Sequence, residues 1–217
     1  MDYQTVTVAL PKGRLLKEAV DFLVKSGIDA SETLSETRKL IFHWKNFRFI
    51  LVKPMDVPTY VYYGTADVGI AGKDVIEEKG YDLYEPLDLK FGACRLSVAE
   101  PEDISEPYDL DRLSYIRVAT KYPKVTDAYF RSKGIHPEII TLYGSVELAP
   151  LVGLSDRIVD LVQTGTTLKV NGLREVDVIL HSTARLIVNR ASLKTKYSLL
   201  KGVIDRMKEL LKEEVVK

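Results

Sequence analysis

The chain has 217 residues, 46% of them hydrophobic and 29% charged, which excludes a disordered protein and provides a core for one large domain or two small ones. Its 31 basic and 31 acidic residues cancel, so no global field favours nucleic acid or an anionic membrane, and any anion site must be built locally. One cysteine, three scattered histidines, and no leader pattern or long apolar run argue against a disulfide, a structural metal and a membrane span, and predict a cytoplasmic protein.

The first part of the chain alternates strands and helices. Apolar residues at helical spacing follow the turn Pro11–Arg14, and Gly27 is placed to end that helix. Asp56 and Pro58 are typical of a helix start. The expected elements are a strand at 5–10, a helix through Val24, a hairpin of strands 39–42 and 47–52 around the turn 43–46, a helix ending at Gly64, and a buried strand at 66–71.

The second part begins with a change of pattern. A strand at 95–99 is followed by the polar segment 101–112, which we interpret as an inserted loop or crossing point where the lobe changes. The expected elements after it are a strand at 117–120, a helix around Val125–Phe130 closed by Gly134, a helix at 148–152 with Ser145 as a plausible N-cap, and a C-terminal amphipathic helix.

Two stretches of the first part are echoed in the second. Ala9, a turn, and later Ser26-Gly27-Ile28 correspond to Ala119, a turn, and later Lys133-Gly134-Ile135. Residues 67–75, DVGIAGKDV, align without gaps on residues 160–168, DLVQTGTTL. The echoes favour two similar α/β lobes facing a shared cleft, although α/β units also resemble one another without any common origin.

The segment Val159–Leu168 carries the clearest chemical signal. An apolar strand delivers Asp160 and then the turn Thr164-Gly165-Thr166-Thr167, whose amides and hydroxyls could converge on a phosphate group. The plainer alternative is a threonine-capped helix start after a strand. Asp160 and Glu147 could face ribose hydroxyls or a magnesium ion on a pyrophosphate, or could be structural.

Cations stand near two other turns. Lys12 and Arg14 flank Gly13 at a strand–helix junction, and Lys121 follows Thr120 in the second part. Two cations beside a helix N-terminus can hold a polyphosphate, although solvated charges are the alternative. For Asp67, near the first-lobe turn, we prefer a structural role.

Three stretches together resemble ATP phosphoribosyltransferase: ALPKGRL at 9–15, the run from Asp56 to Val75, and GSVELAPLVGLSDRIVDLVQTGTTLKVNGL at 144–173. The resemblance implies transfer of phosphoribosyl from phosphoribosyl pyrophosphate to N1 of ATP, with Mg2+, as the first step of histidine biosynthesis. It also implies an α/β fold that is two-lobed and periplasmic-binding-protein-like (type II), with a cleft between the lobes. The first lobe would comprise residues 1–92 and 179–217, and the second, residues 93–178, would carry the phosphoribosyl pyrophosphate loop.

The same resemblance implies roles for single residues. Thr164, Gly165, Thr166 and Thr167 would bind the 5-phosphate, Asp160 would face the ribose hydroxyls, and Glu147 is a secondary candidate there. Another group would contact the nucleotide or pyrophosphate: Lys12, Gly13, Arg14, Thr120 and Lys121. No general base is assigned, because an adenine nitrogen can attack the anomeric carbon directly once the leaving pyrophosphate is neutralised.

The chain ends at Lys217, soon after the amphipathic helix, and so looks like the short form of the enzyme. That form is similar to subunits that work with a separate regulatory partner resembling histidyl-tRNA synthetase, so we expect a homodimer within a hetero-oligomer. The alternatives are a non-catalytic two-lobed small-molecule binding module, a phosphoribosyltransferase of the single-sheet type, and a purely structural subunit. A single-sheet enzyme would have two consecutive acids before the threonine–glycine turn, whereas Val159-Asp160-Leu161 offers one.

Overall fold

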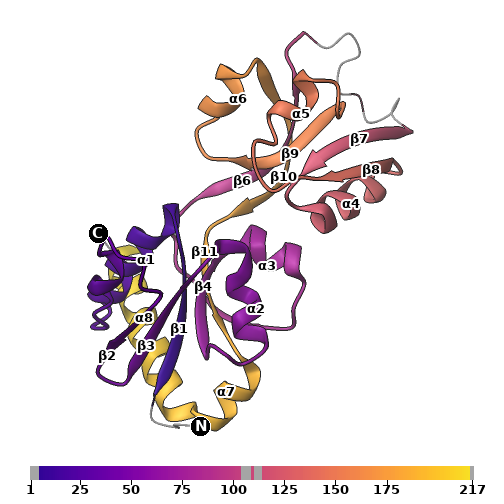
Figure 1. Ribbon diagram of the computed structural model, residues 1–217. Coiled ribbons are helices and arrows are strands. Elements are labelled where there is room, and N and C mark those ends of the chain that lie inside the picture. Colours follow the sequence, from indigo (N-terminus) through magenta and orange to yellow (C-terminus); the bar gives the residue numbers. More distant parts are fainter. Residues whose placement is uncertain (1–4, 104–108, 110–113, 216–217) are drawn as a thin grey trace. The chain divides into compact units, whose positions relative to one another are not determined.

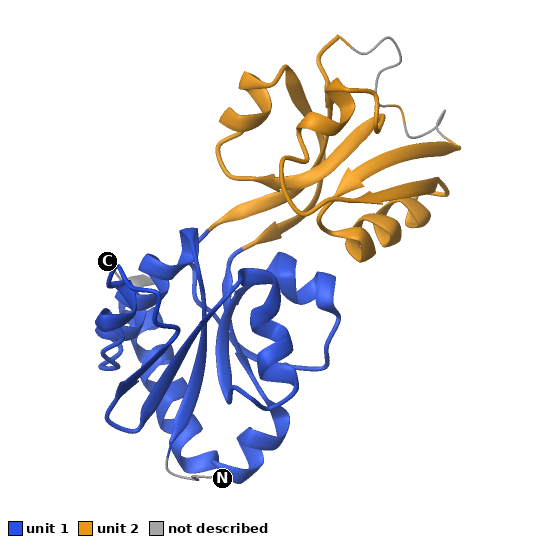
Figure 2. Ribbon diagram, in the orientation of Figure 1, with its two compact units in different colours: residues 1–92, 183–217 blue, residues 93–182 orange. Residues whose placement is uncertain are grey.

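The computed structural model describes residues 5–103, 109 and 114–215 (Figure 1). The chain divides into two compact units: unit 1 comprises residues 1–92 and 183–217, and unit 2 comprises residues 93–182 (Figure 2). Residues 179–182, which the sequence analysis assigned to the first lobe, thus fall in unit 2, because they end a strand of its sheet. Most of the expected inserted loop, residues 104–108 and 110–112, lies outside the described residues.

Unit 1 is built on a six-stranded sheet in the order β2-β3-β1-β4-β11-β5. Strand β1 is parallel to β3 and β4, whereas β2 and β11 are antiparallel to their neighbours. The strands are β1 (Val6–Pro11), β2 (Ile41–Trp44), β3 (Phe47–Val52), β4 (Val68–Gly72), β5 (Tyr84–Asp88) and β11 (Ala184–Val188). The helices are α1 (Arg14–Lys25), η1 (Ser31–Leu34), η2 (Pro54–Asp56), α2 (Val57–Tyr62), α3 (Lys73–Lys79), α7 (Arg190–Thr195) and α8 (Tyr197–Val215).

Both faces of this sheet are covered, which is why β1 is buried along its whole length. Val8 and Leu10 pack with α1 and α8 on one face, and Ala9 between them packs with α2 and α3 on the other (Figure 1). This alternation between two apolar layers is what a near-continuous hydrophobic strand sequence predicts for parallel strands. Lys196 fastens the C-terminal segment to the sheet, because its Nζ donates to buried Asp67 at 2.8 Å and to the carbonyl of Thr5 at 2.7 Å.

Unit 2 is built on a five-stranded sheet in the order β10-β6-β9-β7-β8. Strand β6 is antiparallel to β10 and β9, and β7 is parallel to β8 and β9. The strands are β6 (Cys94–Pro101), β7 (Tyr115–Thr120), β8 (His136–Thr141), β9 (Arg157–Val162) and β10 (Leu173–Ser182), and the helices are α4 (Pro123–Ser132), α5 (Leu148–Leu151) and α6 (Thr166–Val170). Ile158 and Val162 of β9 pack with Ala149 of α5 and Leu168 of α6, so both short helices lie on one apolar cluster beside β9.

The first sequence echo has a physical counterpart. Gly27 and Gly134 follow α1 and α4, and both have a φ of 77°. In each unit the next residue is a buried isoleucine whose amide bonds back into the helix, from Ile28 to Leu23 at 2.9 Å and from Ile135 to Phe130 at 3.0 Å. The two helices therefore end in the same way, by a left-handed glycine and a hydrophobic contact.

In the second sequence echo, the two glycines have equivalent structural positions but the two aspartates do not. Gly72 and Gly165 are the N-caps of α3 and α6. Asp67, however, lies just before β4, where it accepts the amide of Thr7 at 2.8 Å, whereas Asp160 lies inside β9. Asp67 is therefore structural, as preferred from the sequence.

Two local expectations are corrected. Trp44 pairs with Phe47, so the hairpin turn is only Lys45-Asn46, with Lys45 at a φ of 50°. Ser145 is not the N-cap of α5, since that place belongs to Glu147 and Ser145 has a φ of 48°. None of the helices in the described part of the chain is long and apolar enough to cross a membrane.

Candidate functional site

The turn after β9 presents open polar groups. Gly165 has a φ of 81°, a conformation that glycine adopts without strain, and it caps α6. Thr164, Thr166 and Thr167 are exposed, and the hydroxyls of Thr164 and Thr166 lie 3.0 Å apart. Within the described residues, no protein acceptor takes the amide N–H of Thr164 or Gly165. The turn therefore offers hydroxyl and amide donors to an anion.

Asp160 lies in β9, four residues before this turn, and the structure brings two other predicted residues to it. Burial raises the pKa of the Asp160 carboxyl above its ordinary value. The amide of Leu161, which donates to it at 2.8 Å, opposes this shift, the charge of Glu147 adds to it, and the charge of Lys121 opposes it. Glu147, Lys121 and Asp160 thus form one electrostatic group beside the turn.

Thr120 has a different environment from the one expected. It is fully buried, and its hydroxyl donates to the carbonyl of Val159 at 2.7 Å while accepting the amide of Tyr122 at 2.9 Å. The hydroxyl of Thr120 therefore joins β7 to β9 and starts the turn that carries Lys121, which is partly buried. The Thr120 side chain therefore stabilises the fold, whereas the sequence predicted that it contacts a ligand.

Lys12, Gly13 and Arg14 lie in unit 1, at the junction of β1 and α1. All three are exposed, Gly13 has a φ of 91° and caps α1, and the first turn of this twelve-residue helix contains no acidic side chain. The amide of Lys12 donates to the carbonyl of Val52 at 2.8 Å, which fixes the start of the turn against β3. The junction therefore combines a positive helix end with two cations.

A polar network beside β9 was missed in the sequence analysis. Arg95 and Ser97 of β6 and Glu175 of β10 share hydrogen bonds, and Arg95 also reaches the carbonyl of Gln163 at 3.4 Å. Polar residues at alternate positions of an otherwise apolar strand were the available signal for Arg95 and Ser97. Nothing local connects Glu175 to them.

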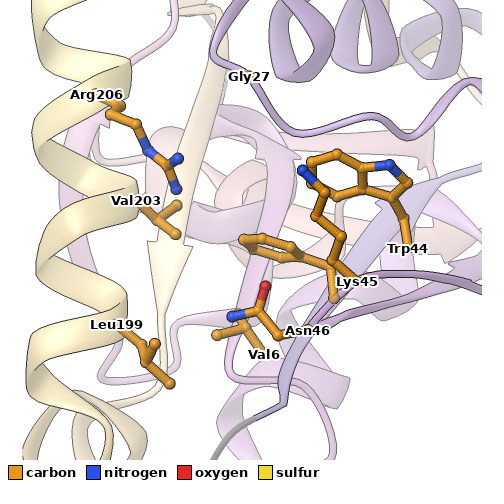
Figure 3. Close-up of a pocket in the computed structure, with 9 residues that line it drawn as sticks. Val6, Gly27, Trp44, Lys45, Asn46, Leu199, Val203 and Arg206 are labelled. Carbon is orange, nitrogen blue, oxygen red and sulfur yellow. The ribbon is translucent and has the colours of Figure 1, made fainter.

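A separate hollow of about 280 Å³ lies in unit 1, between α8 and the β2–β3 turn (Figure 3). Figure 3 shows Arg206 reaching from α8 over Val203, with Trp44, Lys45 and Asn46 opposite. None of the predicted site residues lines this hollow. It therefore does not bear on the phosphate site.

The described residues contain no group of three or more histidine, cysteine, aspartate or glutamate side chains placed to hold a metal ion. Asp160 and Glu147 are two carboxylates, which suits a magnesium ion whose other ligands come from substrate phosphates and water.

Similarity to known proteins covers nearly the whole chain. The model of the family described as HisG: ATP phosphoribosyltransferase matches residues 53–209. The ATP phosphoribosyltransferase of Citrifermentans bemidjiense is 56% identical over 206 residues, which cover 94% of this chain and 97% of that protein. ATP phosphoribosyltransferase 2 of Geobacter sulfurreducens is 57% identical over 206 residues, with coverage of 94% and 97%.

Solved structures agree with the fold. The ATP phosphoribosyl transferase (HisG:HisZ) complex from Thermotoga maritima aligns with a TM-score of 0.83 at 36% identity, covering 96% of this chain and 100% of that chain. Holo ArgBP from T. maritima aligns with a TM-score of 0.60 at 15% identity, covering 95% and 90%, a likeness that shows the fold alone. The two-lobed, periplasmic-binding-protein-like fold class is confirmed.

Proposed function

The chain belongs to the ATP phosphoribosyltransferase family, which catalyses the first step of histidine biosynthesis, and from this premise we propose that unit 2 binds phosphoribosyl pyrophosphate through the turn Thr164–Thr167 and Asp160. The observation that carries the proposal is the open set of amides and hydroxyls on this turn, directly after a strand that presents a carboxylate. A phosphate monoester needs such converging donors.

The three threonine hydroxyls and the amides of Thr164 and Gly165 would donate to the 5-phosphate. Asp160 would accept hydrogen bonds from the ribose hydroxyls. Glu147 is a secondary candidate for the same role, since its charge acts on the Asp160 carboxyl. Two carboxylates beside the ribose also favour positive charge developing at C1 as pyrophosphate leaves. The attack by N1 of adenine then depends on alignment, and no side chain is assigned as general base.

The cationic groups would hold the remaining phosphates. Lys12 and Arg14, with the amides at the start of α1, suit the polyphosphate of ATP or the pyrophosphate, and Lys121 suits the pyrophosphate beside Asp160. Magnesium, carried by the pyrophosphate, would neutralise charge on the leaving group. Asp160 and Glu147 are two carboxylates of unit 2 that such an ion could take as ligands.

We also propose a regulatory partner similar to HisZ, because the chain aligns over 96% of its length with a chain of the HisG:HisZ complex. The alignments with the two relatives named above cover 97% of each relative's length. A cytoplasmic location suits an enzyme that draws on ATP and phosphoribosyl pyrophosphate.

The test is pyrophosphate release by the purified chain given ATP, phosphoribosyl pyrophosphate and Mg2+, with and without the HisZ-like partner. Release only with both substrates is expected, and co-sedimentation of the two proteins should accompany any dependence on the partner. Binding of nucleotide without release under either condition would favour the binding-module alternative. Unchanged activity of an Asp160→Ala variant in the assembled complex would refute the site.

A further inference from the structure

A three-residue polar network lies directly beside the phosphate turn. The guanidinium of Arg95 makes a two-pronged contact with Glu175, with Nε and Nη2 each 2.5 Å from a carboxylate oxygen. The hydroxyl of Ser97 donates to the same carboxylate at 2.8 Å. Ser97 is buried, and Arg95 and Glu175 are partly buried, with side-chain exposures of 30% and 22%. Charge-assisted, bidentate contacts of this kind fix a guanidinium in direction as well as in place.

Strand register places this network alongside the substrate strand. Ser97 is paired with Asp160 and Arg95 with Val162 across the antiparallel β6–β9 ladder. Directly opposed residues of an antiparallel pair project from the same face of the sheet, so Arg95 and Ser97 lie on the face of Asp160. α5 and α6 pack on that same face. Glu147 is the N-cap of α5, and the phosphate turn leads into α6.

The remaining contact of Arg95 acts on the turn itself. Its Nη1 donates to the carbonyl of Gln163 at 3.4 Å, a long bond that depends on Glu175 to keep the guanidinium in place. In a trans peptide the carbonyl of one residue and the N–H of the next point in opposite directions. Orienting the Gln163 carbonyl therefore orients the amide of Thr164, for which no acceptor is found among the described residues.

We propose that Arg95, held by Glu175 and Ser97, is a positioning residue that sets the Gln163–Thr164 peptide plane for the 5-phosphate of the substrate. The proposal rests on the proposed function, in that it takes the turn to be the phosphate site. Arg95 does not touch the substrate in this role. It fixes a donor in advance, which reduces the ordering that substrate binding would otherwise require.

Two variants address the network, and one control resembles it. Arg95→Lys keeps the charge but loses the fork, so one ammonium group cannot hold Glu175 and reach Gln163 together. Glu175→Gln removes the charge that orients Arg95. The control Arg117→Lys alters a similar pair, in which Arg117 contacts Asp156 at 2.7 Å with side-chain exposures of 39% and 33%. This pair lies one residue before Val118 and Arg157, the first paired residues of β7 and β9.

The readout is the dissociation constant of phosphoribosyl pyrophosphate with Mg2+, measured by calorimetry on the full chain, together with that of ATP and the melting temperature. We expect Arg95→Lys and Glu175→Gln each to weaken phosphoribosyl pyrophosphate binding by about 5- to 10-fold and to leave ATP binding within about 2-fold. The double variant should be no weaker than the worse single variant, because both act through one contact. Arg117→Lys should change melting temperature by a similar amount and leave both affinities unchanged.

Thr167→Val separates the two proposals, since it removes one exposed hydroxyl of the turn without altering the network. If Thr167→Val weakens phosphoribosyl pyrophosphate binding and the Arg95 and Glu175 variants do not, the positioning role is refuted and the phosphate site stands. If none of the three weakens it, the phosphate site itself is refuted, and the positioning role with it. Equal losses of phosphoribosyl pyrophosphate and ATP affinity would also refute positioning, because they would indicate general damage to the fold.

Discussion

Replacing Asp160 with asparagine should stabilise the fold and weaken substrate binding at the same time. Burial raises the pKa of the Asp160 carboxyl, which means that its charged form is less favourable in the folded than in the unfolded chain. The folded state therefore binds the proton more readily, and stability falls as pH rises from the unfolded pKa through the folded one. Asparagine cannot ionise, so it removes the penalty that the charged form of Asp160 imposes above the folded pKa.

Binding should change in the opposite direction. A hydrogen bond to a charged group contributes about 1.5 to 3 kcal/mol, and Asp160 is proposed to accept from two ribose hydroxyls. Asparagine keeps the shape and one acceptor oxygen but loses the charge, so we expect a loss of about 2 to 3 kcal/mol. This corresponds to roughly 30- to 140-fold weaker binding of phosphoribosyl pyrophosphate. Thermal unfolding and calorimetry, each at neutral and at mildly acidic pH, measure both effects.

The matched control is Asp156→Asn, four residues earlier. Burial also raises the pKa of Asp156, but hydrogen bonds from the side chain and amide of Arg117, and the charge of Arg117, outweigh it and lower the pKa. Asp156 thus contributes stability that is present above the unfolded pKa and lost as pH falls through the folded one. Asp156→Asn should therefore destabilise without affecting binding. A less stable Asp160→Asn variant with normal binding would show that Asp160 is structural.

Three further outcomes follow from the packing and from the ligand set. Lys196→Met should destabilise by about 3 kcal/mol in urea unfolding because it leaves Asp67 buried without its cation. Lys201 is exposed on α8, so Lys201→Met should change stability little, and equal losses for the two variants would contradict this. Gly69→Ala should cost about 1 to 3 kcal/mol, since its Cβ would meet Val57 and Val61 at 2.8 Å, while Gly202→Ala, with open space, should stabilise by up to about 1 kcal/mol. EDTA should abolish pyrophosphate release. Mg2+ alone should leave the melting temperature unchanged, because the described residues hold no group of three or more side chains placed to bind a metal ion. A higher melting temperature with Mg2+ would indicate a metal site formed by the protein alone.

Features set by neighbouring residues could be predicted from the sequence. The turn Thr164–Thr167 and the helix ends at Gly27 and Gly134 follow from local backbone chemistry, which short motifs encode directly. The strand preceding that turn could be predicted because four of its six residues are apolar, on both sides of Asp160. The substrate roles of these residues were inferred from the family resemblance. Local chemistry alone favoured a phosphate site no more than an ordinary helix start capped by threonine.

Features set by distant pairing could not be predicted. Thr120 had the chemistry of a ligand, but its hydroxyl bonds to Val159, 39 residues away. Arg95 and Glu175 are 80 residues apart, and each alone reads as a solvated charge. The predicted hairpin turn was too long, because no local signal at Trp44 distinguishes the end of a strand from a turn. The pairing of Trp44 with Phe47 makes Trp44 part of the strand.

The position of β11 in the first sheet bears on how the chain is synthesised. Within the described sheet, β5 is paired with β11 alone, and β11 also completes β4, yet Ala184 follows Asp88 only after the whole of unit 2 has been made. A ribosome adding roughly 5 to 20 residues per second needs roughly 5 to 20 seconds for that stretch. During this time unit 2 is contiguous and can fold first, while the nascent β4 and β5 lack the strand whose backbone groups pair with theirs. The yield of folded protein therefore depends on how well these edges are shielded until the last strand emerges.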